Sequence, residues 1–175
     1  MFLIKSDDNF LTDHLLSILN NKKKLFTGDI SKKIFGQITL EKKDDLVSIL
    51  FNQKKINLKF PIIANDIFNE FINLISDYYI SIGNIYYYPL RGKVSYKKKS
   101  IKLNFIHDQI IYLLVINSFE INKNNLYKLI WQNDYEVSMN KLDTHITNLK
   151  NILKKDLNFN LFVKTEGGKV YLVIQ

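Results

Sequence analysis

The sequence contains no cysteine, which excludes disulfides and thiolate metal sites. Its three histidines, His14, His107 and His145, are far apart in the sequence and make a poor set of metal ligands. No uncharged apolar run approaches the roughly 18 residues of a membrane span. The first residues turn acidic too early for a secretion signal. We therefore expect a soluble cytoplasmic protein that needs no metal or other cofactor.

Signatures of catalysis are also missing. There is no phosphate-binding glycine loop, no nucleophile with a local base, and no spacing typical of metal ligands. An enzyme is therefore not expected.

Positive charge is concentrated in the second half of the chain. The net charge is +8; residues 1–79 hold 11 Lys/Arg and 10 Asp/Glu, whereas residues 80–175 hold 14 and 7. An excess of this kind favours a polyanionic partner, because lysines displace counterions from phosphates and give salt-sensitive binding. The alternative is a composition rich in lysine throughout, and the asymmetry counts against it.

Strands and helices alternate in the first half, which predicts an α/β domain. The apolar runs at residues 1–5 and 46–51 are typical of buried strands. A helix is expected between them, with Asn9 or Thr12 as its cap. Its apolar positions recur at roughly helical spacing: Leu11, Leu15, Leu16 and Leu19.

A second amphipathic helix is predicted after Pro61, which breaks the preceding segment. Two roles are open for this helix, covering its own sheet or pairing two subunits. The domain is expected to end near residues 76–79, without a long linker. The apolar residues of the helix are Ile67, Phe68, Phe71, Ile72, Leu74 and Ile75.

The second half predicts a sheet, three helices and a hairpin, in that order. Short antiparallel strands are expected at residues 80–88, 92–96 and 100–103, with turns at residues 89–92 and 97–99. Asn104 and Asn122 are the expected caps of the first two helices. The inward-facing residues would be Ile110, Ile111, Leu114 and Val115 on the first helix, and Leu126, Leu129, Ile130 and Trp131 on the second.

The third helix, at residues 138–153, has one apolar face and one polar face. Asparagine can contact adenine in bidentate fashion, and threonine can touch a thymine methyl. The alternative is an ordinary solvated helix surface. The apolar face consists of Leu142, Ile146, Leu149 and Leu153; the polar face consists of Thr144, Thr147, Asn148, Asn151 and Lys155, and Lys141, Lys150 and Lys154 flank it in reach of phosphates.

The chain ends in a predicted hairpin at residues 161–174. Lys164 precedes its turn and Lys169 follows it, and Gly167-Gly168 allows a tight turn close to a sugar–phosphate chain. The alternative is a plain terminal hairpin with exposed lysines.

Residues 80–174 resemble the winged-helix output domain of OmpR/PhoB-type response regulators. The motifs that carry the resemblance are Leu103-Asn104, residues 121–131 and 142–150, and Lys164 to Gly168 followed by Tyr171. It implies an α+β chain with a C-terminal winged helix-turn-helix, the third helix in the major groove of double-stranded DNA, and the wing on the backbone or minor groove. It also implies a homodimer on DNA and contact with RNA polymerase. The DNA-binding residues implied are Lys141, Thr144, Thr147, Asn148, Lys150, Asn151, Lys164 and Lys169.

The sequence departs from this family in its cations. The family usually has arginine where this chain has Asn148, and Arg91 is the only arginine here. Lysine and asparagine lack the rigid guanidinium fork, so we expect weaker binding or a weaker sequence preference. Lys169-Val170 also lengthens the wing between Gly168 and Tyr171.

Residues 1–78 resemble a shortened, degenerate receiver domain. Asp7 and Asp8 follow the first strand as an acidic pair, and residues 45–50 look like the third strand. In that family the third strand ends in the aspartate that accepts phosphate, and Leu50 stands there. The segment also looks too short for all five receiver strands and helices. We therefore predict a pseudo-receiver that accepts no phosphate, because phosphoryl transfer needs a carboxylate beside Mg²⁺.

Together these features predict a sequence-specific transcriptional regulator of the two-component, phosphorelay type, with residues 79–175 as the DNA-binding domain. The alternative is a protein-interaction adaptor, or a nonspecific DNA binder, that keeps the winged-helix fold. Fold alone does not decide between them.

Overall fold

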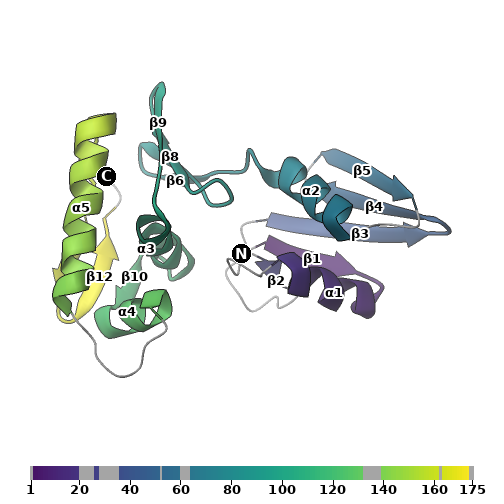
Figure 1. The fold of residues 1–175 in the computed structure, drawn as a ribbon, viewed down its shortest axis with the longest axis horizontal. Helices are drawn as coiled ribbons and strands as arrows, with labels where there is room; N and C mark the ends of the chain where they lie inside the picture. Colours follow the sequence, from purple (N-terminus) through teal and green to yellow (C-terminus); the bar gives the residue numbers. More distant parts are fainter. Residues whose placement is uncertain are drawn as a thin grey trace. The chain divides into compact units, whose positions relative to one another are not determined.

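The computed structural model divides into two compact units, Met1–Tyr78 and Tyr79–Gln175 (Figure 1). It describes residues 2–19, 26–27, 36–51, 53–59, 64–131, 139–161 and 163–173. Both units mix strands with helices, so the chain is of the mixed α+β class, with five helices among the described residues.

The first unit is built on one sheet with the strand order β2-β1-β3-β4-β5. Strand β1 runs parallel to β2 and β3, whereas β3, β4 and β5 form an antiparallel meander. The strands are β1 (Phe2–Ser6), β2 (Phe26–Thr27), β3 (Gly36–Lys43), β4 (Leu46–Phe51) and β5 (Lys54–Lys59), and the helices are α1 (Asn9–Leu19) and α2 (Ala64–Ile75).

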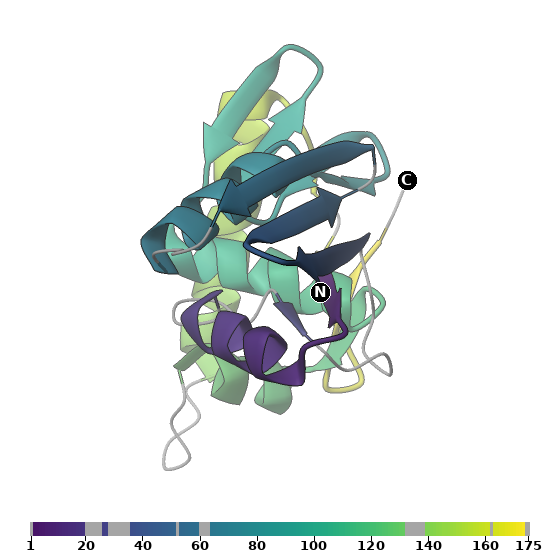
Figure 2. The ribbon, with the colours of Figure 1, turned by 90° about the vertical axis from the view of Figure 1, so that its right-hand side faces the viewer.

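Helices α1 and α2 contact each other and lie on the same face of this sheet (Figures 1 and 2). The side chains of β3 and β4 alternate accordingly, because successive residues of a strand point to opposite faces. The opposite face is mixed: the Ser48 hydroxyl donates to Asn57 Oδ1 at 2.8 Å, and Leu46 on the same face is 41% exposed. The buried positions of these two strands are Ile38, Leu40, Val47, Ile49 and Phe51.

The directions of the strands overturn the assignment of Leu50 to a phosphate-acceptor position. The order 2-1-3-4-5 is one that doubly wound receiver sheets use, but those strands are parallel. Leu50 lies in β4, which is antiparallel to both of its neighbours. Between β1 and β4 lies β3, which the sequence did not predict; its Leu40 pairs with Ser6 of β1 before the strand continues to Lys43.

The expectation that residues 1–78 are too short for all five receiver strands and helices agrees with the described residues, which hold five strands but only the two helices α1 and α2. The connection between β3 and β4 is a tight turn with Asp44 at φ 52°, and antiparallel pairing of β3, β4 and β5 needs no crossover helix.

The start of α1 differs from the expected caps. Asn9 is already the first helical residue, and Thr12 lies within the helix, where its amide and hydroxyl both donate to the Asp8 carbonyl at 3.1 and 3.2 Å. Leu15 is buried as expected, as are Leu74 and Ile75 at the end of α2. Pro61 and the side chains of Leu11, Leu19, Ile67, Phe68 and Phe71 lie outside the described residues, so pairing of subunits through α2 stays a prediction.

The second unit has the predicted order of a sheet, three helices and a hairpin. Two strands were missed. Residues 80–88 form two strands because Gly83, at φ 57°, turns the chain between them, and a short strand precedes α4 and pairs with the last strand. The elements are β6 (Ile80–Ile82), β7 (Ile85–Tyr88), β8 (Lys93–Tyr96), β9 (Lys99–Lys102), α3 (Phe105–Ile116), β10 (Glu120–Asn122), α4 (Lys123–Trp131), α5 (Met139–Leu157), β11 (Val163–Glu166) and β12 (Lys169–Leu172).

Both asparagine caps of this unit are confirmed. The Asn104 side chain accepts from the His107 amide at 2.9 Å, and Asn122 Oδ1 accepts from the amides of Asn124 and Asn125 at 2.9 and 3.2 Å. The predicted inner face of α3 is buried throughout, namely Ile110, Ile111, Leu114 and Val115.

The prediction for α4 is wrong at one position. Leu126 and Ile130, four residues apart, are buried together with Tyr127, which the sequence reading left out. Leu129 lies on the outer side of the helix and is 54% exposed, and Trp131 is half-buried.

A buried polar contact joins the β6–β9 sheet to the helices. The Tyr87 hydroxyl donates to Asp108 Oδ1 at 2.6 Å, and both residues are buried. Burial first, and then the neighbouring Asp108 carboxylate, raises the pKa of Tyr87 well above its ordinary value. A Cβ at Gly92, which has φ 54°, would lie 3.4 Å from the Asp108 carboxyl carbon, so this turn fits closely over the contact.

Candidate nucleic-acid interface

Helix α5 has the two faces that the sequence predicted. Its apolar stripe is buried, with Leu142, Leu149 and Leu153 at 0% exposure and Ile146 at 4%, and the stripe extends to Leu157. These residues pack α5 against α3 and α4. All five residues predicted for the opposite face are exposed, namely Thr144, Thr147, Asn148, Asn151 and Lys155.

The polar groups on this face differ in what they offer a ligand. The Thr144 hydroxyl donates to the Asn140 carbonyl at 2.8 Å, which occupies its proton within the helix. Asn148 and Asn151 carry exposed amides, and no described residue hydrogen-bonds to them. An unpaired amide presents a donor and an acceptor side by side, which is the pattern that reads an adenine edge.

The lysines that flank the face are of two kinds. The Lys141 ammonium lies 4.7 Å from the centroid of the Trp131 ring, so it takes part in joining α5 to α4 by a cation–π contact. Lys150 is half-buried, whereas Lys154 and Lys155 in the last turn are exposed.

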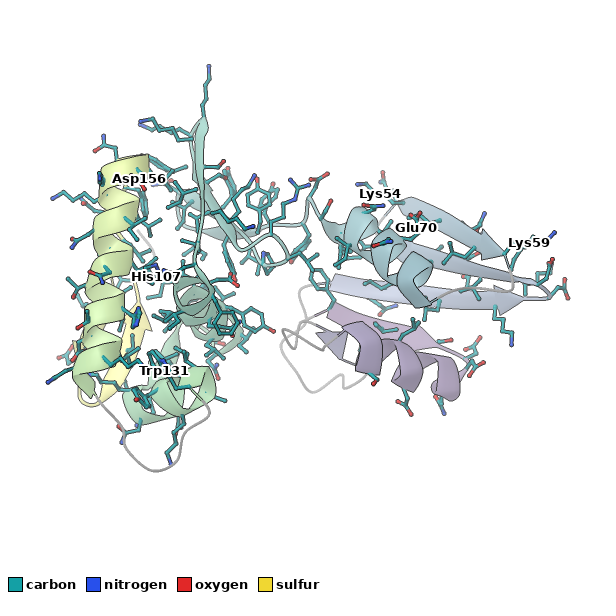
Figure 3. All side chains as sticks on the ribbon, in the orientation of Figure 1. Lys54, Lys59, Glu70, His107, Trp131 and Asp156 are labelled. Carbon is teal, nitrogen blue, oxygen red and sulfur yellow. The ribbon has the colours of Figure 1, made fainter. Side chains whose placement is uncertain are left out.

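Beside Lys141, a series of ring–ring contacts connects α4, α5 and α3. The Trp131 centroid lies 4.5 Å from that of Tyr127 and 5.7 Å from that of His145, and His145 lies 5.8 Å from His107. His107 and Trp131 are labelled in Figure 3. His107 is buried and its Nε2 has no hydrogen-bond partner among the described residues. Burial, and then the neighbouring His145, lowers the pKa of His107.

The β11–β12 hairpin forms the predicted tight turn. Gly167 and Gly168 have φ 56° and 73°, in the left-handed region that glycine adopts without strain. Lys164 and Lys169 lie on either side of the turn and are both exposed. They differ in one respect that the sequence did not predict: Lys169 Nζ is paired with the Glu120 carboxylate on β10. The hydrogen bond to Glu120, and then its charge, raises the pKa of Lys169.

Lys123, at the start of α4, links the hairpin to α5. Its amide donates to the Gly168 carbonyl at 2.9 Å, and its ammonium lies 2.8 Å from Asp143 Oδ2 on α5. The Lys123 side chain is only 16% exposed, so this pair is partly shielded from water. Lys123 therefore bonds both to the turn of the hairpin and to the N-terminal half of α5.

The sequence reading missed Lys123, Asp143 and Glu120. No local pattern could have found them, because Lys123 and Asp143 are 20 residues apart and Lys169 and Glu120 are 49 apart. The strand β10, which carries Glu120, is only three residues long.

Within the described ranges, no three His, Asp or Glu side chains come together in a way that could hold a metal ion. No helix in the same ranges has both the length and the apolar character to cross a membrane.

No protein-family model and no curated protein sequence matches the chain. Among solved structures, it is similar to the DNA-binding domain of CadC from E. coli, with a TM-score of 0.46 and 16% sequence identity. That match covers 54% of this chain and 91% of the CadC chain.

Proposed function

We propose that residues 79–175 bind double-stranded DNA as a winged helix-turn-helix, with α5 in the major groove and the β11–β12 hairpin, the wing, on the neighbouring backbone or minor groove. The observation that carries this proposal is the exposed polar face of α5, whose opposite face is fully buried. A helix held in this way can enter a groove without exposing the core.

In this arrangement the side chains divide into two groups. Asn148, Asn151, Thr144 and Thr147 meet base edges, because they carry amides or methyl groups rather than charges. The lysines contact phosphates and set the register of the protein on the duplex. These are Lys141 and Lys150 on the helix and Lys164 and Lys169 on the wing.

The charge of the chain agrees with this division. The net charge of +7 that residues 80–175 carry belongs to the unit with the exposed helix face. The lysines have to supply nearly all of the phosphate contact, since Arg91 is the only arginine. Binding should therefore depend steeply on salt.

We further propose that the chain regulates transcription as a homodimer on DNA, in contact with RNA polymerase, and that the first unit serves pairing or partner contact rather than phosphotransfer. Strand β3, which lies beside β1, carries Glu41, Lys42 and Lys43 at its carboxyl end, where a receiver needs its acceptor aspartate. In this proposal the first unit is a degenerate receiver that accepts no phosphate.

The test of DNA reading is a gel-shift titration at several salt concentrations, with the DNA upstream of the chain's own coding sequence and a random duplex. Asn148→Ala should relax the preference at one base pair by about 1–3 kcal/mol. Asn73→Ala removes an exposed asparagine from α2 in the first unit and serves as the control. A preference for the upstream DNA that survives Asn148→Ala unchanged would show that α5 does not read bases as proposed.

A second candidate is a protein-interaction adaptor that retains this fold. Three of the eight proposed contact residues already have partners within the chain: Lys141 with Trp131, Lys169 with Glu120, and the Thr144 hydroxyl with the Asn140 carbonyl. Leu129 on α4 is 54% exposed and would suit a protein partner. Equal and weak binding to both duplexes in the same titration would favour this candidate, or a nonspecific DNA binder.

A further inference from the structure

A second basic hairpin lies at the other end of α5. Residues 79–107 contain no Asp or Glu but hold six cationic side chains. Three of these, Lys97, Lys98 and Lys99, follow one another at the turn between β8 and β9 and are all exposed. None of the three has an ion-pair partner among the described residues, and Lys97 adopts φ 53° to make the turn.

Side-chain packing positions this turn beside α5. Strand β9 contacts α5, and the Tyr96 ring at the end of β8 lies 5.1 Å from the Phe159 ring just after the helix. The Lys97 ammonium lies 5.1 Å from the centroid of Tyr96, so the contact extends to the lysines. In both ribbon views the β8–β9 turn lies toward the C-terminal end of α5, whereas the wing turn lies toward its N-terminal end (Figures 1 and 2).

The charge of α5 continues toward this turn. Lys154 and Lys155 are exposed in its last turn, and Lys150 lies one turn earlier. Of the two acids on α5, Asp143 is paired with Lys123, and Asp156 is the one at this end (Figure 3). The lysines at this end of α5 and at the turn repel one another, because few acidic side chains lie among them. A bound polyanion would relieve that repulsion.

We propose that the β8–β9 turn is a second wing, whose lysines 97–99 contact the phosphate backbone of duplex DNA beyond the C-terminal end of α5. This inference rests on the proposed function and extends it, because the helix would be held between two phosphate-binding hairpins. A duplex is the favoured partner because these lysines lie beside the end of α5 that already carries the exposed Lys154 and Lys155. The length of duplex that the protein contacts would then be greater than the length that α5 and the wing contact alone.

The first test compares two triple variants of the full chain by fluorescence anisotropy, with one duplex at several salt concentrations. Replacing Lys97, Lys98 and Lys99 by serine should lower the slope of log K against log salt by about 1–3, since each phosphate contact contributes roughly 0.9. The matched control replaces Lys43, Lys54 and Lys55 of the first unit by serine, which removes the same charge, and should leave the slope unchanged.

The second test uses the absence of native cysteine. Lys98→Cys, labelled with an aryl azide, should crosslink to the duplex on one side of the segment that α5 protects, and Lys164→Cys should crosslink on the other side. Lys55→Cys is the negative control. Crosslinking from Lys164→Cys without crosslinking from Lys98→Cys would overturn the second wing.

The outcomes separate this inference from the proposed function. If Lys164→Ala weakens duplex binding while the Lys97–Lys99 variant behaves like the unaltered chain, only the second wing is wrong. If the unaltered chain binds no duplex, both proposals are wrong. If the variant loses affinity for a single-stranded oligonucleotide or for polyglutamate but keeps it for the duplex, the turn serves another partner and the inference fails.

Discussion

Lys123 Nζ lies 2.8 Å from Asp143 Oδ2, and the amide of the same lysine donates to the carbonyl of Gly168 in the wing turn. A helix that reads a groove and a hairpin that follows the backbone must keep a constant spacing. Lys123 joins the two elements directly, because its ammonium contacts α5 and its amide bonds to the wing turn.

Breaking the Lys123–Asp143 pair should therefore affect stability and binding together. In a double-mutant cycle with Lys123→Met and Asp143→Asn, we expect a coupling free energy of about 1 kcal/mol, at the upper end for exposed pairs because Lys123 is mostly buried. Fluorescence of Trp131, the only tryptophan of the chain, reports urea unfolding of this unit. Lys123→Met should also weaken binding to all duplexes equally. No coupling, or a change in sequence preference alone, would contradict this role.

The two wing lysines should behave differently on DNA. Lys164→Ala should lower the salt slope by about 1, because Lys164 is free to replace a counterion. Lys169→Ala should lower it less, since Glu120 already neutralises Lys169. Glu120→Gln should in turn strengthen binding and raise the slope. These slopes come from anisotropy titrations, and equal effects of the two lysine variants would show that the Glu120 pair opens on DNA.

Tyr87→Phe should destabilise the second unit by about 1–3 kcal/mol, because it removes the buried hydrogen bond to Asp108. Tyr86→Phe is a matched control on the same strand. Tyr86 is 41% exposed, so its loss of a hydroxyl should change the free energy of unfolding by less than about 0.5 kcal/mol. Urea titrations followed by Trp131 fluorescence measure both. A similar effect of the two variants would mean that the Tyr87–Asp108 contact contributes no net stability.

His107 should make the second unit less stable in acid. Its pKa in the folded chain lies below the ordinary value of 6.5, so the unfolded chain binds the proton more readily. The part of the free energy of unfolding that depends on neutral His107 is fully present above about pH 6.5. It is lost as the pH falls through the lowered pKa. His107→Leu should flatten this part of the profile, whereas His145→Gln should leave most of it, because burial is the larger cause. The measurement is the urea midpoint from pH 4.5 to 7.5. A profile that His107→Leu leaves unchanged would assign the acid sensitivity to other groups.

The first unit should accept no phosphate. Incubation with Mg²⁺ and acetyl phosphate, followed by intact-mass analysis, should show no acid-labile addition. The reason differs from the one that Leu50 suggested: Glu41, Lys42 and Lys43 occupy the carboxyl end of the strand beside β1. A stoichiometric phosphate on Asp7, Asp8 or any other aspartate would contradict it.

Features set by neighbouring residues could be predicted from the sequence. The buried stripe of α5 follows from apolar residues three and four apart, and the caps Asn104 and Asn122 act on amides two or three residues away. The wing turn follows from two adjacent glycines. In each case, the residues that determine the structure lie within a few positions of the structure they determine.

Features set by distant residues could not be predicted. The direction of β4 depends on which strands pair with it, and an apolar run is compatible with either direction. Strand β3 is polar on one face and was missed for that reason. The exposure of Leu129 depends on which side of a short helix meets the core. The partners of Lys123 and Lys169 come from other elements, so nothing beside these lysines indicates them.

Strand β5 is the edge of the first sheet, and it carries three lysines, Lys54, Lys55 and Lys59, among its six residues (Figure 3). An open edge offers unpaired backbone groups to any other strand and invites aggregation. If two copies met edge to edge at β5, these lysines would face each other at the spacing of neighbouring strands, and their repulsion would oppose the contact. The lysines of β5 therefore disfavour pairing of two copies through this edge.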